Sequence, residues 1–505
     1  MSDSVKLALL HLNVLYGENR KNRENILSLA AKAADGGAKI IVSPEMGLSG
    51  YRYRDREAIK HRVEPADGPS AKAFAAFAKE RGVFLVTGFG ERDRATGMFH
   101  NSAFAFSPEG KLVSRYRKIN AESRWACPGN PEDDNVFDTP WGKAGILICS
   151  DSYHSLPVRV TALRGASLVL LPANWPPTNE FPGSIWRFRA LENGVWFAAC
   201  NRTGKEEMFD CEDSVSHVFS PEGESLLAHE GPDSACPTVD IPLDEKGRFA
   251  GNEIREGILS RRRPWVYHRI YANLIFFRSI TDTLGLPSPR GVDVRFFAPG
   301  PGENPVRFLE ERLDTLYVDT LVALPHYPHS EEDLDALKGI SLERKVIIMT
   351  ARMENDLKTY LVIDGKDIAR HPRPEDGFVD PVFAGPLVTR FCDAEELRHP
   401  EPMICAAKKG ADLVLAIEEN ITPSDRLAVA IRPIDQVAAA FCAQNGAALG
   451  LVPEGHVTGR GAAAGPRADF SYNLDTRILR DKHFQDRVDF KLLCAGGGRE
   501  EDRCE

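Results

Sequence analysis

The chain has 505 residues, and its 63 basic and 73 acidic residues give a formal net charge of −10. This mild acidity disfavours a surface for nucleic acid or anionic membranes. Ten cysteines without a C-x-x-C spacing disfavour a disulfide scaffold or zinc finger and favour a reducing, cytoplasmic location. No apolar run approaches the length of a membrane span, and the first residues lack the pattern of a signal peptide.

The first 200 residues alternate between strand and helix patterns. Apolar runs at 5–12 and 38–43 predict buried strands on either side of a helix at 23–34. Beyond them the pattern predicts strands at 83–89, 102–107, 112–116, 144–149, 167–172 and 195–201, and helices at 71–81, 157–164 and 185–194. Because the connections are short and the strands are apolar on both faces, we expect an α/β fold with helix-covered sheets.

The second half repeats short segments of the first in the same order. The string GASLVL at 165–170 recurs as GADLVL at 410–415, and ENG at 192–194 has an expected counterpart in QNG at 444–446, each after a helix. These matches predict tandem duplication rather than a short-period solenoid. The predicted organisation has a first domain, a linker or helix, a second domain and a disordered tail, at 1–268, 269–291, 292–490 and 491–505.

Three polar residues lie at or just beyond the ends of predicted buried strands, namely Glu45, Lys118 and Cys149. Burying a charge is costly unless it is paired, and functional groups of α/β folds collect at the carboxyl ends of strands. A cysteine beside a carboxylate base and an ammonium group could act as a nucleophile, with the cation stabilising the oxyanion that attack creates. Each residue alone also fits a structural role, as a buried cysteine, a turn glutamate or a solvated lysine.

Together these motifs resemble the nitrilase superfamily of carbon–nitrogen hydrolases. The resembling segments are Pro-Glu at 44–45 followed by Gly-Tyr at 50–51, Tyr-Arg-Lys at 116–118 and GILICSD at 145–151, with support at 101–102, 165–166, 172–175 and 189–194. The resemblance spans residues 5 to about 268 and implies an α-β-β-α sandwich. It also implies Glu45 as general base and acid, Lys118 as oxyanion stabiliser and Cys149 as nucleophile.

The resemblance further suggests a fourth carboxylate and a substrate class. Glu122 matches the family's additional glutamate, which would hold Lys118 and the substrate amide in place; a plain surface loop is the alternative. Ser150 and Asp151 after the cysteine resemble amide-cleaving members, so a small-molecule amide or carbamoyl substrate is favoured over a nitrile. The candidate pocket residues are Tyr51, Ser150, Tyr153, His154, Asn174 and Trp175.

Three functions other than amide hydrolysis stay open at this point: nitrile hydrolysis, acyl transfer to an amine, and binding or scaffolding without catalysis. We predict no organic cofactor and no metal, because no histidine cluster has the spacing of metal ligands.

In the second half, other residues replace the proposed triad. His326 matches Glu45, and Arg373 matches Lys118 because each follows a Gly-Lys pair at the same distance. We therefore predict a degenerate, catalytically inactive nitrilase-like sandwich. It would pair with the first domain as an intramolecular pseudo-dimer, with further homo-oligomerisation left open; a regulatory ligand-binding domain is the rival hypothesis.

The counterpart of Cys149 has two possible alignments in the second half. One places Phe391 there, with Asp393 matching the aspartate after the nucleophile, and the other places Thr389 there. In both alignments Cys392 lies next to the position without occupying it, so we predict that the copy has no nucleophile.

Overall fold

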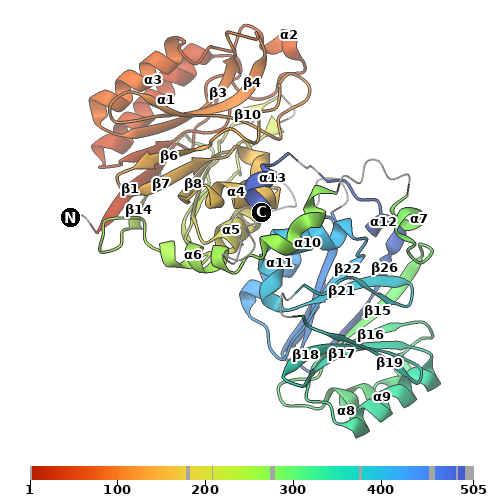
Figure 1. Cartoon of the computed structure of the whole chain (residues 1–505). Helices are drawn as coiled ribbons and strands as arrows, with labels where there is room; N and C mark the ends of the chain where they lie inside the picture. The colour runs from red at the N-terminus through yellow and green to blue at the C-terminus, as the bar shows by residue number, and fades with distance from the viewer. Residues whose placement is uncertain are drawn as a thin grey trace, which may run out of the picture. The chain divides into compact units, whose positions relative to one another are not determined.

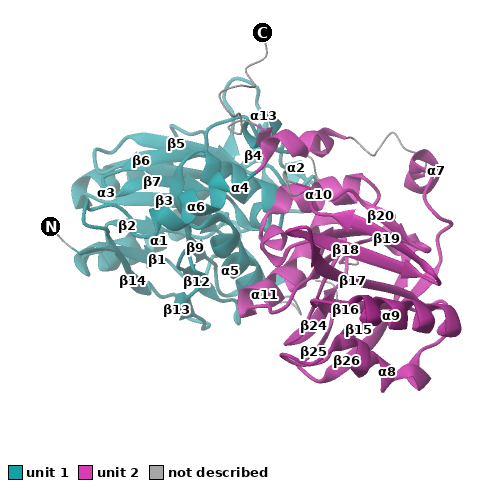
Figure 2. Ribbon diagram, turned by 60° about the horizontal axis from the view of Figure 1, so that its bottom comes forward, with its two compact units in different colours: residues 1–262, 486–493 teal, residues 263–485, 494–505 magenta. Residues whose placement is uncertain are grey.

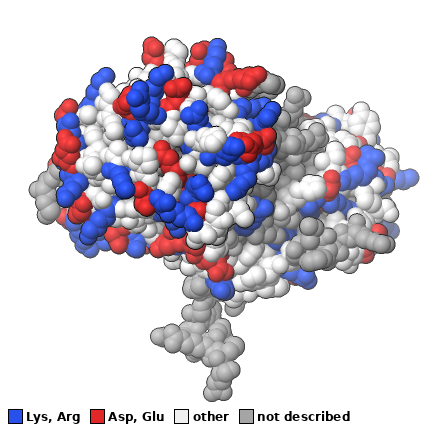
Figure 3. All heavy atoms as spheres, turned by 90° about the horizontal axis from the view of Figure 1, so that it is seen from above, with Lys and Arg blue, Asp and Glu red and all other residues white. Residues whose placement is uncertain are grey.

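The computed structural model describes residues 3–177, 182–207, 209–272, 279–374, 378–453, 461–484 and 487–494. It divides into two compact units, one formed by residues 1–262 and 486–493 and the other by residues 263–485 and 494–505 (Figure 2). Among the described residues, no helix is long and apolar enough to cross a membrane. Basic and acidic side chains are interspersed over the face that Figure 3 shows.

The first unit contains two six-stranded sheets. The first sheet has the order β14 (Thr238–Pro242), β1 (Ser4–Leu9), β2 (Ile40–Val42), β3 (Phe84–Arg92), β4 (Phe99–Phe106) and β5 (Leu112–Arg117). The second has the order β13 (Ser225–His229), β12 (Ser216–Phe219), β9 (Trp196–Cys200), β8 (Ala166–Pro172), β7 (Gly142–Ile146) and β6 (Val136–Thr139). In each sheet three parallel strands lie between antiparallel ones.

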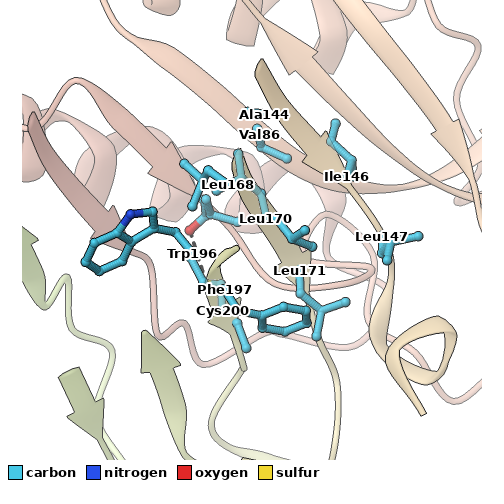
Figure 4. Close-up of a cluster of buried hydrophobic side chains, with 14 of the residues drawn as sticks. Val86, Ala144, Ile146, Leu147, Leu168, Leu170, Leu171, Trp196, Phe197 and Cys200 are labelled. Carbon is cyan, nitrogen blue, oxygen red and sulfur yellow. Dashed lines mark hydrogen bonds between the residues drawn. The ribbon is translucent and has the colours of Figure 1, made fainter. Parts of the chain in front are cut away.

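The two sheets of the first unit pack face to face. Their inner faces share one buried cluster that includes Val42, Val86, Ile146, Leu170 and Phe197, part of which Figure 4 shows. Alternate residues of the first sheet pack outward against α1 (Asn19–Asp35) and α3 (Pro69–Arg81), while α4 (Ser155–Leu163) and α5 (Pro182–Asn193) cover the second (Figure 1). This α-β-β-α arrangement confirms the predicted fold of the first half, because strands buried on both faces need helices outside.

The second unit also contains two six-stranded sheets. One has the order β26 (Ala468–Asp475), β15 (Gly291–Ala298), β16 (Leu321–His326), β17 (Ile347–Glu354), β18 (Leu357–Asp364) and β19 (Asp367–Pro372). The other has the order β20 (Val382–Ala384), β21 (Leu387–Cys392), β22 (Leu413–Ile417), β23 (Ala438–Ala443), β24 (Gly446–Gly450) and β25 (Ala462–Ala464). Strand order and orientation follow those of the first unit strand by strand.

The remaining described elements are short or helical. The first unit also has α2 (Arg56–Ile59), the 3-10 turn η1 (Cys149–Ser152), the strand pair β10 (Lys205–Glu206) and β11 (Phe209–Asp210), and α6 (Asn252–Ser260). The second has η2 (Pro264–Tyr271), α7 (Ile280–Leu284), α8 (Pro305–Glu310), η4 (Leu313–Thr315), α9 (Glu331–Arg344), η5 (Ala394–Arg398), α10 (Pro400–Lys408), α11 (Pro423–Ile431), η6 (Arg432–Asp435) and α12 (Thr476–Leu479).

Helix α13 (Phe490–Cys494) occupies the region where the sequence predicted a disordered tail from residue 491. That prediction is therefore wrong for 491–494, and residues 495–505 lie outside the described ones. Leu493 is fully buried, Asp489 pairs with Arg164 at 3.3 Å, and the Arg487 side chain donates to the Ile119 carbonyl at 3.3 Å. The segment is ordered because it belongs to the first unit rather than following the second as a free end.

Strand register identifies which positions of the two units correspond. Glu45 lies three residues after a residue of β2 that pairs with β3. His326 lies three residues after the corresponding residue of β16, which pairs with β17. The Lys118 N–H donates to the Asn101 carbonyl at 2.8 Å, and the Arg373 N–H donates to the Lys358 carbonyl at 2.9 Å in the same way. His326 and Arg373 therefore occupy the positions of Glu45 and Lys118, and Lys358 occupies that of Asn101.

The position of Cys149 corresponds to Ala394. Cys149 lies three residues after a residue of β7 that pairs with β8, and it begins the 3-10 turn η1. Ala394 lies three residues after the corresponding residue of β21, which pairs with β22, and it begins the 3-10 turn η5. Both sequence alignments, with Phe391 or Thr389 at this position, are therefore wrong. Asp393 suggested the wrong register because it resembles the aspartate after the cysteine, whereas it precedes the turn.

The expected match between 192–194 and 444–446 is also wrong. Residues 192–194 follow helix α5, whereas 444–446 form the tight turn between the antiparallel strands β23 and β24. By register, the counterpart of Gly194 is Gln436, and both have a positive φ, 62° and 67°. An Asn-Gly pair between strands is a hairpin signal, so its similarity to the helix-ending Asn-Gly was fortuitous.

Candidate active site

Glu45, Lys118 and Glu122 form one buried charged group in the first unit. The Lys118 Nζ lies 2.7 Å from Glu45 Oε1 and 2.7 Å from Glu122 Oε1, and their side chains are 1%, 0% and 8% exposed, respectively. Glu45 follows β2, Lys118 follows β5 directly, and Glu122 lies in the loop beyond it. The structure thus brings together three of the predicted catalytic residues, and the side chain of Glu122 is not on the surface.

Close backbone packing fixes the turn that carries Glu45. A Cβ at Gly88 of β3 would lie 2.3 Å from the Pro44 carbonyl oxygen, so only glycine lets β3 pass this turn. The next residue, Met46, has a φ of 50°, and the Glu45 N–H donates to the Ala173 carbonyl at 3.3 Å. The last contact ties the end of β2 to the end of β8, so the carboxylate is held between the two sheets.

Cys149 begins η1 with a φ of 44°, a conformation that side-chain-bearing residues rarely adopt. The sequence placed this residue at the end of a strand, but β7 ends three residues earlier, at Ile146. Asp151 stabilises the turn, because its carboxylate accepts the backbone N–H groups of Ile148 at 3.2 Å and Asn120 at 2.9 Å. The Tyr116 hydroxyl donates to the same carboxylate at 2.8 Å.

Burial and charge separate the pKa values of the two glutamates. Burial raises the pKa of Glu45 to about 7, although the Lys118 charge opposes the rise. Burial acts on Glu122 too, but Lys118 and its hydrogen bonds lower the pKa of Glu122 to about 2. Burial also works against the Lys118 charge, yet the two carboxylates raise the pKa of Lys118 well above its usual value. At neutral pH, Glu45 can therefore exchange a proton while Glu122 stays ionised.

The thiol of Cys149 is protonated at neutral pH. Burial raises its pKa well above the usual value, and the negative charge of Glu45 raises it further. This response shows that the thiol and the Glu45 carboxylate are close together. A thiol in this state attacks a carbonyl only if a base removes its proton as the bond forms.

The predicted pocket residues lie in several different environments. Tyr51 belongs to the charged group, because its hydroxyl donates to Glu122 Oε1 at 2.7 Å. Asn174 lies beside the cysteine, since its backbone N–H lowers the pKa of Cys149, and its Oδ1 accepts from the Cys211 thiol at 3.7 Å. The Ser150 hydroxyl donates to the Asn120 carbonyl at 3.3 Å.

The other three pocket candidates are linked by their rings. The ring of Tyr153 lies 5.4 Å from that of His154 and 6.4 Å from that of Trp175. The backbone N–H of Trp175 donates to Asn201 Oδ1 at 2.9 Å. These contacts place the residues together without assigning any of them to substrate.

Two residues of this region were missed as site residues. The Asn101 amide donates to Glu45 Oε1 at 2.7 Å and to Glu122 Oε2 at 3.0 Å. The ring of Phe209 stacks on that of Tyr51 at 5.4 Å. Asn101 lay within a motif of the family resemblance, but an asparagine beside a strand carries no signal of its own, and Phe209 lies outside the quoted motifs. Across the described ranges, no group of His, Cys, Asp or Glu could hold a metal ion.

Known proteins similar to this chain are carbon–nitrogen hydrolases. The family model described as carbon-nitrogen hydrolase matches residues 6–243. A protein named "Hydrolase in pqqF 5'region" from Pseudomonas protegens is 33% identical over 49% of this chain and 85% of its own length. The omega-amidase NIT2-B of Xenopus laevis is 30% identical over 48% of this chain and 88% of its own length. The chain belongs to the carbon–nitrogen hydrolase family.

Among solved structures, a carbon-nitrogen hydrolase from Helicobacter pylori has a TM-score of 0.48 at 22% identity, covering 54% of this chain and 99% of that one. The family membership makes the chain a carbon–nitrogen hydrolase.

Proposed function

We propose that the first unit hydrolyses a small-molecule amide or carbamoyl compound through a thioester on Cys149. The observation that carries this proposal is the Lys118 ammonium, held 2.7 Å from both Glu45 and Glu122 beside a protonated, buried thiol. This group supplies a nucleophile, a base with a pKa of about 7 and a fixed positive charge. Together these groups can open a carbon–nitrogen bond through an acyl-enzyme.

Attack begins with proton transfer from the Cys149 thiol to Glu45 as sulfur bonds to the amide carbon. The carbonyl oxygen becomes an oxyanion, which the Lys118 ammonium and the Ser150 backbone N–H stabilise. Fixed donors of this kind act strongly because they are already oriented in a buried site. Glu45 then gives its proton to the nitrogen, the carbon–nitrogen bond breaks, and ammonia or an amine leaves a thioester.

Hydrolysis of the thioester uses the same base. Glu45 takes a proton from water as the water oxygen bonds to the thioester carbon, and the second oxyanion collapses with loss of the sulfur. The thiolate takes the proton back from Glu45, and the acid product leaves. Since each proton taken by Glu45 is returned within the cycle, the carboxylate ends ionised and ready for another turnover.

Amide substrates are favoured over nitriles by the residues after Cys149 and by the amidase relatives. Ser150 and Asp151 resemble the residues of amide-cleaving members, and the Asp151 carboxylate accepts the backbone N–H groups of Asn120 and Ile148. Nitrile hydrolysis and acyl transfer to an amine remain the alternatives, because both could use the same three groups.

Trapping the acyl-enzyme tests this function. The full chain is mixed with a panel of small amides, carbamoyl compounds and nitriles, quenched in acid and digested for mass spectrometry. We expect an acyl group on Cys149 and none on that peptide in Cys149→Ala. An acyl group on another residue, or turnover by Cys149→Ala, would overturn the proposal. The released product, either acid or N-acyl amine, separates hydrolysis from transfer.

We also propose that the second unit is a degenerate nitrilase-like sandwich without this chemistry. The matching strand order and orientation support a common architecture, and His326, Arg373 and Ala394 at the three key positions support the loss of activity. Pairing of the two units and a cytoplasmic location stay predictions.

A further inference from the structure

Asn101 contacts both glutamates of the proposed catalytic site. It lies on β4, is fully buried, and its Nδ2 is 2.7 Å from Glu45 Oε1 and 3.0 Å from Glu122 Oε2. Its backbone carbonyl oxygen also accepts the backbone N–H of Lys118 at 2.8 Å. One residue thus contacts all three charged members of the site.

The hydrogen bonds divide the two oxygens of Glu45 between different tasks. Oε1 accepts from both Lys118 and Asn101, each at 2.7 Å, whereas Oε2 is buried and accepts from no protein group. A carboxylate oxygen engaged by two donors is a poor proton acceptor, and a buried unpaired oxygen is a good one. Oε2 is therefore the atom available to take the thiol proton.

The site also has an unfavourable charge balance, which Asn101 eases. Two carboxylates share the single Lys118 ammonium, and like charges this close in a buried place favour protonation of one of them. The Asn101 amide offers an N–H dipole to each carboxylate without adding a charge. A second lysine at this point would neutralise the pair and compete with Lys118 for the same oxygens.

We propose that Asn101 is a positioning residue that turns Glu45 Oε2 toward the Cys149 thiol and helps to keep Glu45 and Glu122 ionised together. This inference rests on the proposed function, because it assigns the atom that performs its proton transfer. The second unit supports the importance of this strand position. There Lys358 replaces Asn101, and its Nζ contacts Asp393 at 3.0 Å and Glu418 at 2.9 Å.

The test measures how fast iodoacetamide alkylates Cys149 in the full chain as pH varies, read by peptide mass spectrometry. This probe forms a sulfur–carbon bond and releases iodide, and Glu45 takes the thiol proton, so no substrate needs to be known. For the wild type we expect a midpoint near pH 7, where Glu45 ionises. In Asn101→Leu the midpoint should rise by about one pH unit, because hydrogen bonds to a charged group favour its ionised form. Alkylation at pH 7 should slow about fivefold, because the ionised fraction of Glu45 falls from one half to about one tenth.

Asn135→Leu is the matched control. Asn135 is also buried and its Nδ2 also makes two hydrogen bonds, to the Ile146 carbonyl and the Thr161 hydroxyl, both at 2.8 Å, but it contacts neither glutamate. Asn135→Leu should lower the free energy of unfolding without changing the pH midpoint of Cys149 alkylation. Should Asn101→Leu fail to fold, Asn101→Asp is nearly the same size and should also raise the midpoint, because it adds a negative charge.

An unchanged midpoint in both Asn101 variants, or an equal shift in Asn135→Leu, would overturn the assignment. Failure of the proposed function gives a different result. In that case Cys149→Ala would keep its turnover, whatever the alkylation profile of the Asn101 variants.

Discussion

Both units place a lysine between two carboxylates near the ends of their strands. In the first unit Lys118 contacts Glu45 and Glu122, each at 2.7 Å. In the second, Lys358 contacts Asp393 at 3.0 Å and Glu418 at 2.9 Å. These lysines come from different strand positions, because Lys358 corresponds to Asn101. The two units therefore form a similar local charge pattern from lysines at different positions of the same sheet framework.

The units differ in how the charges are balanced and how a thiol is presented. Arg373 adds a second cation to the second unit, 2.7 Å from Asp393, so that two cations lie beside its two acids. Cys392 is buried near these acids, but it is the last residue of strand β21, whereas Cys149 sits in a turn with a φ of 44°. The comparison indicates that reactivity depends on the positive-φ turn that carries the thiol and on two acids that share one lysine, and not on residue types alone.

The largest expected effect separates the two cysteines. Cys149→Ala should lower kcat by about 10³-fold or more, because no other group can form the acyl-enzyme. Cys392→Ala should leave kcat unchanged, since that thiol belongs to the unit in which His326, Arg373 and Ala394 stand at the triad positions. Steady-state kinetics on the amide identified by trapping checks both variants. Equal losses in the two variants would show that the second unit takes part in the chemistry.

The next effect separates the two lysines. Lys118→Met should lower kcat by about 10²–10³-fold, the usual cost of removing an oxyanion-stabilising group. Lys358→Met should leave kcat unchanged but lower the free energy of unfolding by about 3 kcal/mol, because two partly buried carboxylates lose their common partner. Kinetics and urea unfolding of each variant distinguish these outcomes. A loss of kcat without a loss of stability in Lys358→Met would refute the non-catalytic role.

The pH dependence compares the acids of the two units. Since the pKa of Glu45 is about 7 and the base must be ionised, kcat/KM should fall as pH drops through 7 and approach a tenfold loss per unit below it. Glu122→Gln should move the midpoint to lower pH, because the charge of Glu122 raises the pKa of Glu45. Glu418→Gln should leave the midpoint where it is. A pH-independent wild type between pH 5 and 8 would contradict Glu45 as the base.

The sequence predicted the first unit better than the second for a physical reason. Glu45, Lys118 and Cys149 are weak signals one by one, but the motifs around them resemble those of the carbon–nitrogen hydrolases, and that resemblance implied their roles. Asn101 could not be assigned a role, since only the packing of β4 against the other strands shows that its amide reaches two glutamates. Asn101 lies 56 positions from Glu45 and 21 positions from Glu122 in the sequence.

In the second unit the sequence placed His326 and Arg373 where strand register also places them, but it misplaced the nucleophile position. The reason is local: Asp393 imitates the aspartate of the first unit's motif, and only the pairing of β21 with β22 fixes the register at Ala394. Hairpin and helix-ending Asn-Gly pairs are likewise indistinguishable until strand pairing is known.

The smallest effect compares two buried tyrosines. The Tyr51 hydroxyl donates to Glu122 at 2.7 Å, and the Tyr360 hydroxyl donates to Asp393 at 3.1 Å. Tyr51→Phe should lower kcat/KM by roughly tenfold, because a hydrogen bond to a charged group is worth about 1.5 kcal/mol or more and Glu122 positions Lys118. Tyr360→Phe should lower the free energy of unfolding by about 1.5 kcal/mol without changing kcat/KM. If Tyr51→Phe behaved like Tyr360→Phe, the loop that carries Glu122 would be held well enough by Lys118 and Asn101 alone. That result would refute a role of Tyr51 in positioning Glu122, and it would leave the roles of Glu45, Lys118 and Cys149 unchanged.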